Sequence, residues 1–366
     1  MDIQPKVNKQ ISPYFVFFLI SGMQIGVGML GFQRIIAKVS GNDAWISVLI
    51  SGVSINLLIW MCYKILSRNE QTIDMVGIHR DLFGKWVGGL LSSIFVIYFM
   101  GTAIVVLRTY LEVIQVWMFP DLNIPIVLVV MLLLVYSYIT GGLRTVTGFM
   151  LIGKLFILLI MPLLFFPMKH AHLSNLAPVW DHSFMEILEG SKAMTLNYLG
   201  FELILMYYPF IKQPLRSKKC AHLGALFTTF IYVITMLATL IYYHQEQLKD
   251  VIWATLTFWK VITLPLVERF EYVGISIWLF IILPNVCLGF WAASRGMKRL
   301  FNMKQKKAVV VFMVISYIIC ILLNTRQDID QLNTFVSQVG FYIVYAYIPF
   351  LFILQMIVYK VRERKK

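Results

Sequence analysis

The sequence is poor in charged side chains, which make up 14% of its 366 residues, whereas hydrophobic residues make up 59%. Soluble globular domains carry about 25% charged residues. Together with a mean hydropathy of +0.77, this scarcity excludes a soluble globular domain. The composition instead predicts a protein that crosses a membrane several times.

Acidic side chains are especially scarce, because 18 aspartates and glutamates stand against 32 lysines and arginines, for a net charge of +14. With the N-terminus placed in the cytoplasm, most of the basic residues fall in the predicted cytoplasmic segments. This asymmetry follows the positive-inside rule and predicts that both termini are cytoplasmic. The cations are spread over separate segments that would face anionic lipid headgroups, so they do not indicate nucleic-acid binding.

Motifs for covalent and metal chemistry are also lacking. The four cysteines lie in or beside the apolar runs and form no CxxC pair, so we expect no disulfide framework. No P-loop, HExxH motif, Ser/His/Asp set or pair of carboxylates occurs at a suitable depth, so nothing favours an enzyme and we expect no cofactor. His170 and His172 form an HxH pair without further ligands nearby, and we expect solvated histidines and no metal site.

Apolar runs long enough to cross a bilayer as helices dominate the chain. We predict an all-α polytopic membrane protein with about ten transmembrane helices in a single integral membrane domain, residues 1–366. The predicted spans are 11–35, 43–65, 87–116, 122–141, 145–167, 191–211, 220–243, 268–293, 308–324 and 334–359, followed by a basic cytoplasmic tail, 360–366.

The predicted spans divide into two repeats of five, about 11–167 and 191–359, with an outer loop at about 168–190. Because five is odd, the second repeat inserts upside down relative to the first, as in inverted-repeat transporters. The first span of each repeat is interrupted, the first by glycines and the sixth around 197–200. Discontinuous helices one and six predict a binding site near the middle of the membrane.

The glycines of span one lie in Gly26-Val27-Gly28-Met29-Leu30-Gly31. This GxGxxG pattern is typical of dinucleotide binding only between a strand and a helix of a soluble βαβ unit. Inside a membrane span it indicates instead a weakened helix, whose freed backbone groups are tolerated where they line a cavity. We therefore predict a ligand cradle there.

Residues 245–267, in an outer segment, carry Trp253, Trp259 and Leu264 among charged residues. This pattern predicts a short amphipathic helix at the outer surface. Two interpretations remain open, a lid over the binding site and an interfacial helix without a gating role.

A few ionisable side chains lie at predicted membrane depth, where each needs a partner or a function. Arg108 and Glu112 are spaced i,i+4 and predict a structural ion pair; alternatively, one of them lines a water pathway. Glu202 follows the break in span six and either caps the second half-helix or couples ligand binding to order in the cavity. Lys154 is expected to snorkel to the cytoplasmic interface, the alternative being a positive charge that replaces a bound sodium ion.

In order and spacing, several motifs resemble the B subunit of spore germinant receptors over essentially the whole chain. They are Gln24-Ile25-Gly26-Val27-Gly28-Met29-Leu30, Arg108 before Phe119-Pro120-Asp121-Leu122-Asn123-Ile124-Pro125, and Gly200-Phe201-Glu202 followed by Pro209. The resemblance implies the inverted-repeat fold of the amino acid–polyamine–organocation transporter superfamily. It also implies a role in the spore inner membrane, where the B subunit senses small nutrients beside an A-type and a C-type subunit.

The family usually carries an acidic residue after a glycine beyond the position of Tyr138, whereas this chain reads Gly141-Gly142-Leu143-Arg144. We therefore carry over no role for the inner end of span four.

Carried over residue by residue, the resemblance places the backbone of the ligand against the two interrupted segments. The free backbone groups at the breaks support the same placement. The carboxylate of an amino acid would accept hydrogen bonds from the N–H groups of the half-helix after Gly28, and its ammonium group would meet carbonyls freed at the breaks. The predicted ligand-binding residues are Ile25, Gly26, Val27, Gly28, Met29, Leu30, Asn197, Tyr198, Leu199, Gly200 and Phe201. Side-chain contacts from spans three and eight are predicted at Leu107, Tyr110 and Ser276.

Two functions therefore stay open. One is a nutrient sensor, in which the ligand shifts the bundle between two conformations that partner subunits read. The other is a transporter that moves an amino acid coupled to protons or sodium. The cradle serves both functions, and only the family resemblance favours sensing.

Overall fold

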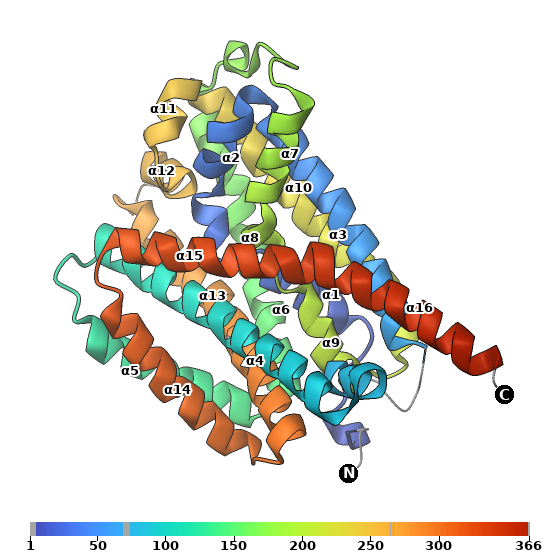
Figure 1. Cartoon of the computed structure of the whole chain (residues 1–366). Coiled ribbons are helices and arrows are strands. Elements are labelled where there is room, and N and C mark those ends of the chain that lie inside the picture. The colour runs from blue at the N-terminus through green and yellow to red at the C-terminus, as the bar shows by residue number, and fades with distance from the viewer. Residues whose placement is uncertain (1–4, 69–73, 264, 266, 365–366) are drawn as a thin grey trace.

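We describe the protein from a computed structural model that covers residues 5–68, 74–263, 265 and 267–364. Figure 1 shows a bundle of helices in which α3 (Ala44–Leu66) and α10 (Lys218–Tyr242) run side by side. An isolated parallel bridge pairs Ile11 with Ile211. This bridge ties the start of the chain to the end of span six.

Span one is broken as the glycines predict. Helix α1 (Phe15–Gln24) ends before Gly26, which is extended at φ −123° and ψ −150°. A short 3₁₀ turn, η2 (Val27–Leu30), then leads into α2 (Phe32–Ser40). The break follows from sequence, because closely spaced glycines weaken a helix.

Span six is broken as well, and it begins earlier than predicted. Helices α7 (Phe184–Ala193) and α8 (Thr195–Tyr198) form its first half. Gly200 then adopts a left-handed backbone at φ +111°, and α9 (Ile204–Tyr207) lies in the second half between two 3₁₀ turns. The capping box of Ser183 and Glu186 starts α7 inside the predicted outer loop, because it satisfies the first free N–H groups of the helix.

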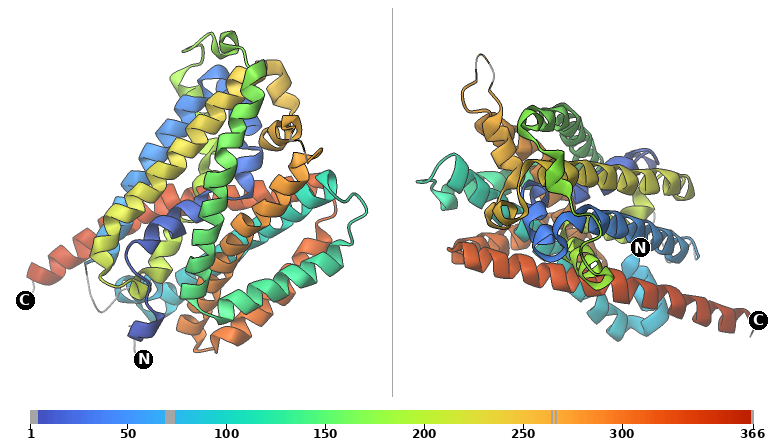
Figure 2. Two further views of the ribbon diagram at one scale, coloured as in Figure 1. Left: turned by 180° about the vertical axis from the view of Figure 1, so that it is seen from behind. Right: turned by 90° about the horizontal axis from the view of Figure 1, so that it is seen from above.

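The remaining spans are mostly continuous helices. They are α3, α4 (Met75–Trp117), α5 (Ile124–Thr140), α6 (Leu143–Ile160), α10, α13 (Phe270–Phe301), α14 (Gln305–Leu322) and α15 (Arg326–Phe341), which continues through a π-helical turn, Tyr342–Tyr347, into α16 (Ile348–Arg364). Helix α4 is interrupted at Gly84, whose φ of +76° and ψ of −177° are not helical, so the part after this kink begins close to the predicted start of span three at 87. Helix α15 begins at Arg326, before the predicted start of span ten at 334. Figure 2 shows α15 and α16 as one long rod across a face of the bundle.

Among the described residues, seven helical stretches are long and apolar enough to cross a membrane. Two shorter apolar helices, α1 and α5, accompany them, and the pieces of span six are shorter still. One of the seven, Phe32–Leu66, joins α2 and α3 across Gly41, where φ of +46° turns the chain. The chain is therefore an integral membrane protein built as a bundle of helices.

A buried carboxylate holds the segment between spans five and six, which the sequence predicts to be an outer loop. Asp43, fully buried between α2 and α3, accepts hydrogen bonds from the backbone N–H groups of Trp180, Asp181 and His182 at 2.8, 2.9 and 3.1 Å. Three such bonds compensate a buried carboxylate for the loss of water. They fix the outer loop over the ends of span one and span two.

The predicted amphipathic helix at 245–267 is instead two short helices, α11 (Gln245–Asp250) and α12 (Ala254–Val261). Leu264 lies outside the described residues. The indole of Trp259 is fully buried and Trp253 is only 8% exposed, so this segment packs into the bundle rather than lying flat on its surface. The two interpretations of its role, a lid and a helix without a gating role, both stay predictions.

Candidate ligand-binding site

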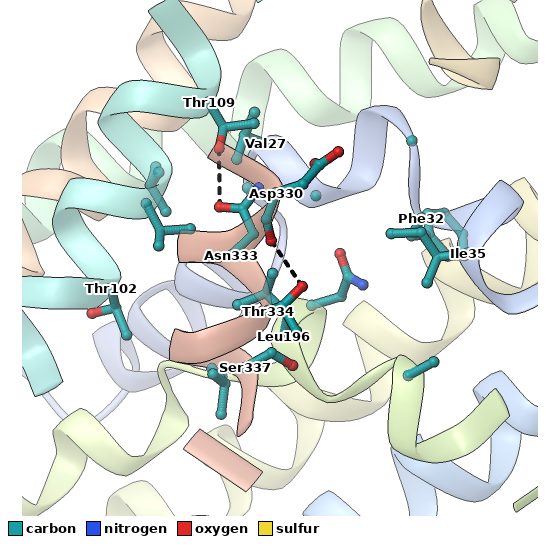
Figure 3. Close-up of a pocket in the computed structure, with 18 of the residues that line it drawn as sticks. Val27, Phe32, Ile35, Thr102, Thr109, Leu196, Asp330, Asn333, Thr334 and Ser337 are labelled. Atoms are coloured by element: carbon teal, nitrogen blue, oxygen red, sulfur yellow. Dashed lines mark hydrogen bonds between the residues drawn. The ribbon is translucent and has the colours of Figure 1, made fainter. Parts of the chain in front are cut away.

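The two helix breaks meet at a cavity of about 720 Å³ (Figure 3). Such a volume is within the range of small-molecule sites. The predicted residues that line it are Gly26, Val27, Gly28, Asn197, Leu199 and Gly200. The structure thus brings together two segments that are about 170 residues apart in the chain, and both contribute backbone to the same surface.

The other predicted cradle residues lie behind this surface. They are buried side chains that do not line the cavity: Ile25, Met29, Leu30, Tyr198 and Phe201. Tyr198, for example, donates from its hydroxyl to Thr229 Oγ1 at 3.1 Å, in the direction of α10. These residues position the breaks by packing.

The three predicted side-chain contacts from spans three and eight are wrong. Leu107 and Tyr110 are buried on another face of α4, where the Tyr110 hydroxyl donates to the Ile275 carbonyl at 2.7 Å. Ser276 is exposed and donates to the carbonyl of Tyr272 in its own helix. The face of α4 that lines the cavity is the one with Thr102, Val105, Val106 and Thr109.

Three carboxamides surround the break in span one. Gln24 donates from Nε2 to the Tyr198 carbonyl at 3.2 Å, which ties the two breaks together, while its Oε1 has no partner. Asn197 Oδ1 is also buried without a partner, next to Gly28, and both amide atoms of Asn285 are unpartnered next to Gly26. Buried polar atoms are normally paired, so these free carboxamide atoms offer uncharged donors and acceptors around the break.

Helix α15 forms one wall of the cavity, which was not predicted from the sequence. Its cavity-lining residues share one helix face and are mostly polar: Arg326, Asp330, Asn333, Thr334, Ser337, Gln338 and Phe341. Figure 3 shows Asn333, Thr334 and Ser337 of α15 on the same side of the cavity as Thr102 and Thr109 of α4, with Phe32 and Ile35 of α2 opposite. The spacing of these polar residues, at i, i+3, i+4, i+7 and i+8, is the signal in the sequence that would have found them.

The predicted ion pair between Arg108 and Glu112 is wrong. Arg108 donates from Nε and Nη2 to the Leu323 carbonyl at 3.1 and 2.7 Å. Glu112 instead pairs with Arg326 at 2.8 Å, and Arg326 also pairs with Asp330 at 2.9 Å. The start of α15 thus supplies one cation, which two carboxylates share at this edge of the cavity.

Replacing Arg326 by Gln is expected to destabilise the protein by about 1–2 kcal/mol. The change leaves Glu112, whose side chain is 9% exposed, without its cation, and the partial exposure of Arg326 limits the cost. Thermal unfolding of the purified protein in detergent measures the loss. The exposed pair of Lys249 and Glu246 provides a control, because Lys249→Gln should leave the melting temperature unchanged. Equal melting temperatures for wild type and Arg326→Gln would contradict the role given to this ion pair.

The outer edge of the cavity carries the remaining charges and an indole. Arg34, Glu189 and Lys192 line this part of the cavity, and Trp253 lies with its ring 5.0 Å from the Arg326 guanidinium. Ile252 lines the cavity beside it. One end of the segment for which a lid is one of the two interpretations therefore lies at the cavity, as a lid requires.

Glu202 is fully buried and does not line the cavity. Its Oε2 accepts from the Gly200 N–H at 2.8 Å, and its Oε1 accepts from the Tyr98 hydroxyl at 2.7 Å. The carboxylate thus satisfies a backbone donor at the break, as the predicted capping role requires, and that role stays a prediction. The bond to Tyr98 adds a link from the break in span six to α4.

Lys154 does not snorkel to the interface. Its side chain is 2% exposed, its Nζ has no hydrogen-bond partner, and it lies 4.9 Å from the centroid of the Phe227 ring. A cation–π contact is therefore its main compensation for burial. The alternative, a positive charge in place of a bound ion, stays a prediction.

A family model described as "Spore germination protein" matches residues 10–329. The chain is 43% identical to spore germination protein GerQB of Bacillus cereus over 360 residues, which cover 98% of this chain and 99% of that one. It is 25% identical to spore germination protein YndE of Bacillus subtilis, with 94% and 95% covered, and 24% identical to spore germination protein B2 of the same organism, with 79% of each covered.

Two solved transporters share the fold. A Na⁺-coupled sialic acid symporter superposes with a TM-score of 0.69 at 13% identity, covering 95% of this chain and 79% of that one. MhsT, solved in complex with L-phenylalanine, superposes with a TM-score of 0.62 at 15% identity, covering 93% and 87%. At these identities the likeness concerns the fold.

Proposed function

Because the chain belongs to the spore germination protein family, we propose that it is the nutrient-binding subunit of a spore germinant receptor. The observation that carries this proposal is the convergence of the breaks in spans one and six on one cavity. A germinant bound there contacts backbone from both repeats at once. Each of the two broken helices consists of two halves that can move separately. A ligand that contacts both helices can therefore shift the equilibrium between two conformations of the bundle, which is what a sensor requires.

The ligand best suited to the site is a small amino acid or a similar zwitterion. The turn η2 starts at Val27, and the first N–H groups of a helical turn have no partner within it, so a carboxylate can accept from them. The free Oδ1 of Asn197 is an acceptor for the ammonium group. Neither contact needs a charged side chain at the bottom of the cavity.

The signal then passes to partner subunits. In this proposal the chain sits in the spore inner membrane with both termini on the core side, beside A-type and C-type receptor subunits. The family membership and the resemblance of the motifs support this assembly. An allosteric coupling of about 1–3 kcal/mol between the nutrient site and the subunit contacts is enough to switch such a receptor.

The alternative function is an amino-acid transporter coupled to protons or sodium. The buried, unpartnered ammonium of Lys154 favours it, because an ionisable group at membrane depth commonly marks an ion or proton pathway. The two solved structures with this fold are consistent with either function.

Sensing and transport differ in proteoliposomes. The purified full chain, reconstituted in lipid vesicles, is expected to bind radiolabelled amino acid without concentrating it, whether a proton or a sodium gradient is imposed. Equilibrium binding and gradient-driven uptake are measured on the same preparation, with empty vesicles as the control. Concentrative uptake that collapses with the gradient would contradict the sensor and favour the transporter.

A further inference from the structure

The polar wall of the cavity is one continuous face of α15. We call Asp330, Asn333, Thr334, Ser337 and Gln338 the α15 stripe; all five line the cavity. On a different face of the same helix, the side chain of Phe335 is 63% exposed. Outside the cavity lining, the helix carries Ile329 and Val336, which are buried, and the exposed Phe335 and Gln331, so its polar residues are concentrated on the face turned towards the cavity without being confined to it.

Polar side chains in a membrane-spanning helix are costly unless they face a cavity or a partner. The stripe makes few bonds within the protein. Thr109 donates to Asn333 Oδ1 at 3.3 Å, and Thr334 donates to the carbonyl of Asp330 in its own helix. Within the described part of the chain, the side chains of Ser337 and Gln338 make no hydrogen bond, although their backbones are bonded within the helix. Several donors and acceptors of the stripe are therefore available to a ligand.

The single carboxylate of the stripe is already engaged by a cation. Asp330 accepts two bonds from Arg326, at 3.0 Å from Nε and 2.9 Å from Nη2, and it shares this guanidinium with Glu112. The other members of the stripe are amides and hydroxyls. A ligand group that lies against Asn333 and Ser337 therefore meets uncharged hydrogen-bonding partners, which suit an uncharged polar group.

The wall opposite the stripe includes the apolar side chains of Phe32 and Ile35 of α2. Helix α4 lies on the same side as the stripe and adds two valines and two threonines, of which Thr109 is already bonded to Asn333. Away from the two breaks, most of the uncharged hydrogen-bonding side chains that line the cavity therefore come from α15. A site built to hydrogen-bond a substrate group rejects analogues that lack it, because its own polar groups are then left unpaired.

We infer that the α15 stripe is the specificity surface of the site and selects ligands that carry an uncharged hydroxyl or carboxamide group beyond their backbone. This inference rests on the proposed function, which holds the backbone of the ligand at the two breaks. Asn333 and Ser337 lie near the middle of the stripe and form hydrogen bonds with the polar group of the ligand's side chain.

Matched pairs of amino acids test this inference. Binding of L-threonine against L-valine and of L-asparagine against L-leucine to the purified full chain in lipid nanodiscs is measured by calorimetry. The members of each pair have nearly the same size and differ in one polar group. We expect the wild type to prefer the polar member by about tenfold or more per pair. We expect Asn333→Leu and Ser337→Ala each to reduce the preference for the polar member of a pair to about threefold or less. The affinity for the apolar member of that pair should stay at the wild-type value or rise.

The control is Gln331→Leu, on the same helix but outside the cavity lining, which keeps the wild-type preference. Monodisperse elution and an unchanged melting temperature show that each variant is folded. A preference that persists in both stripe variants, or a wild type that prefers the apolar members, overturns the inference and leaves the proposed function standing. A wild type that binds no member of either pair contradicts the amino-acid site of the proposed function and overturns this inference with it.

Discussion

Gly28→Ala is expected to abolish the nutrient response while the protein still inserts in the membrane. A methyl group added at Gly28 would overlap Asn197 Oδ1, at the point where the two breaks face each other. The amide of Asn197 must then swing away, and the methyl fills space that the ligand backbone needs. Overpacking and the loss of one polar contact together cost about 3 kcal/mol, a loss of roughly 100-fold in affinity. The loss of optical density of spores on nutrient addition reports the response.

A matched glycine separates this effect from a general loss of folding. Gly148, in α6, has open space where a methyl would go, so Gly148→Ala should respond normally. The double variant Gly28→Ala with Asn197→Ala removes the overlap but also the amide. It is expected to recover thermal stability and not the response. A normal response of Gly28→Ala spores, at wild-type protein levels, would refute the assignment of this cavity as the nutrient site.

Glu202→Ala is the second change with a large expected effect. It leaves the N–H of Gly200 and the hydroxyl of Tyr98 without an acceptor, in a region where Glu202 is fully buried. Each unsatisfied buried donor costs about 1–3 kcal/mol, so the break in span six loses about 2–6 kcal/mol of stabilisation. Gly200 forms part of the cavity surface, and we therefore expect loss of both ligand binding and thermal stability.

Two milder variants test whether Glu202 couples the cavity to α4. Glu202→Gln keeps one acceptor oxygen and should retain part of the stability. Tyr98→Phe removes only the link to α4, and should leave ligand affinity near the wild-type value while it weakens the germination response. If Tyr98→Phe leaves both affinity and response unchanged, Glu202 acts as a helix cap and the coupling role fails. If Glu202→Ala binds ligand and melts as the wild type does, both roles fail.

The two helix breaks were predictable because their causes are local. Gly26 and Gly28 weaken the helix that contains them, and Gly200 supplies the positive φ at which span six turns. The α15 stripe was equally visible as a helical repeat of polar residues. It was missed because span ten was predicted to start at 334, which left Asp330 and Asn333 outside the helix.

The charged residues show where local rules fail. The i,i+4 spacing of Arg108 and Glu112 predicts a pair, yet Glu112 takes its cation from Arg326, which is 214 residues away. Lys154 was assigned to the interface from its distance to the end of the span. Packing of α6 against its neighbours instead leaves it buried beside Phe227.

The sequence by itself determined that this is a membrane protein of many helices with breaks in spans one and six. Hydrophobic length and backbone propensity are properties of a segment and need no partner. Only the tertiary structure decided that Val27 and Leu199 line the cavity while Met29 and Tyr198 do not, and that α15 rather than α13 forms its polar wall. The rotation of a helix about its axis and the partner of each buried charge depend on packing against helices far away in the chain.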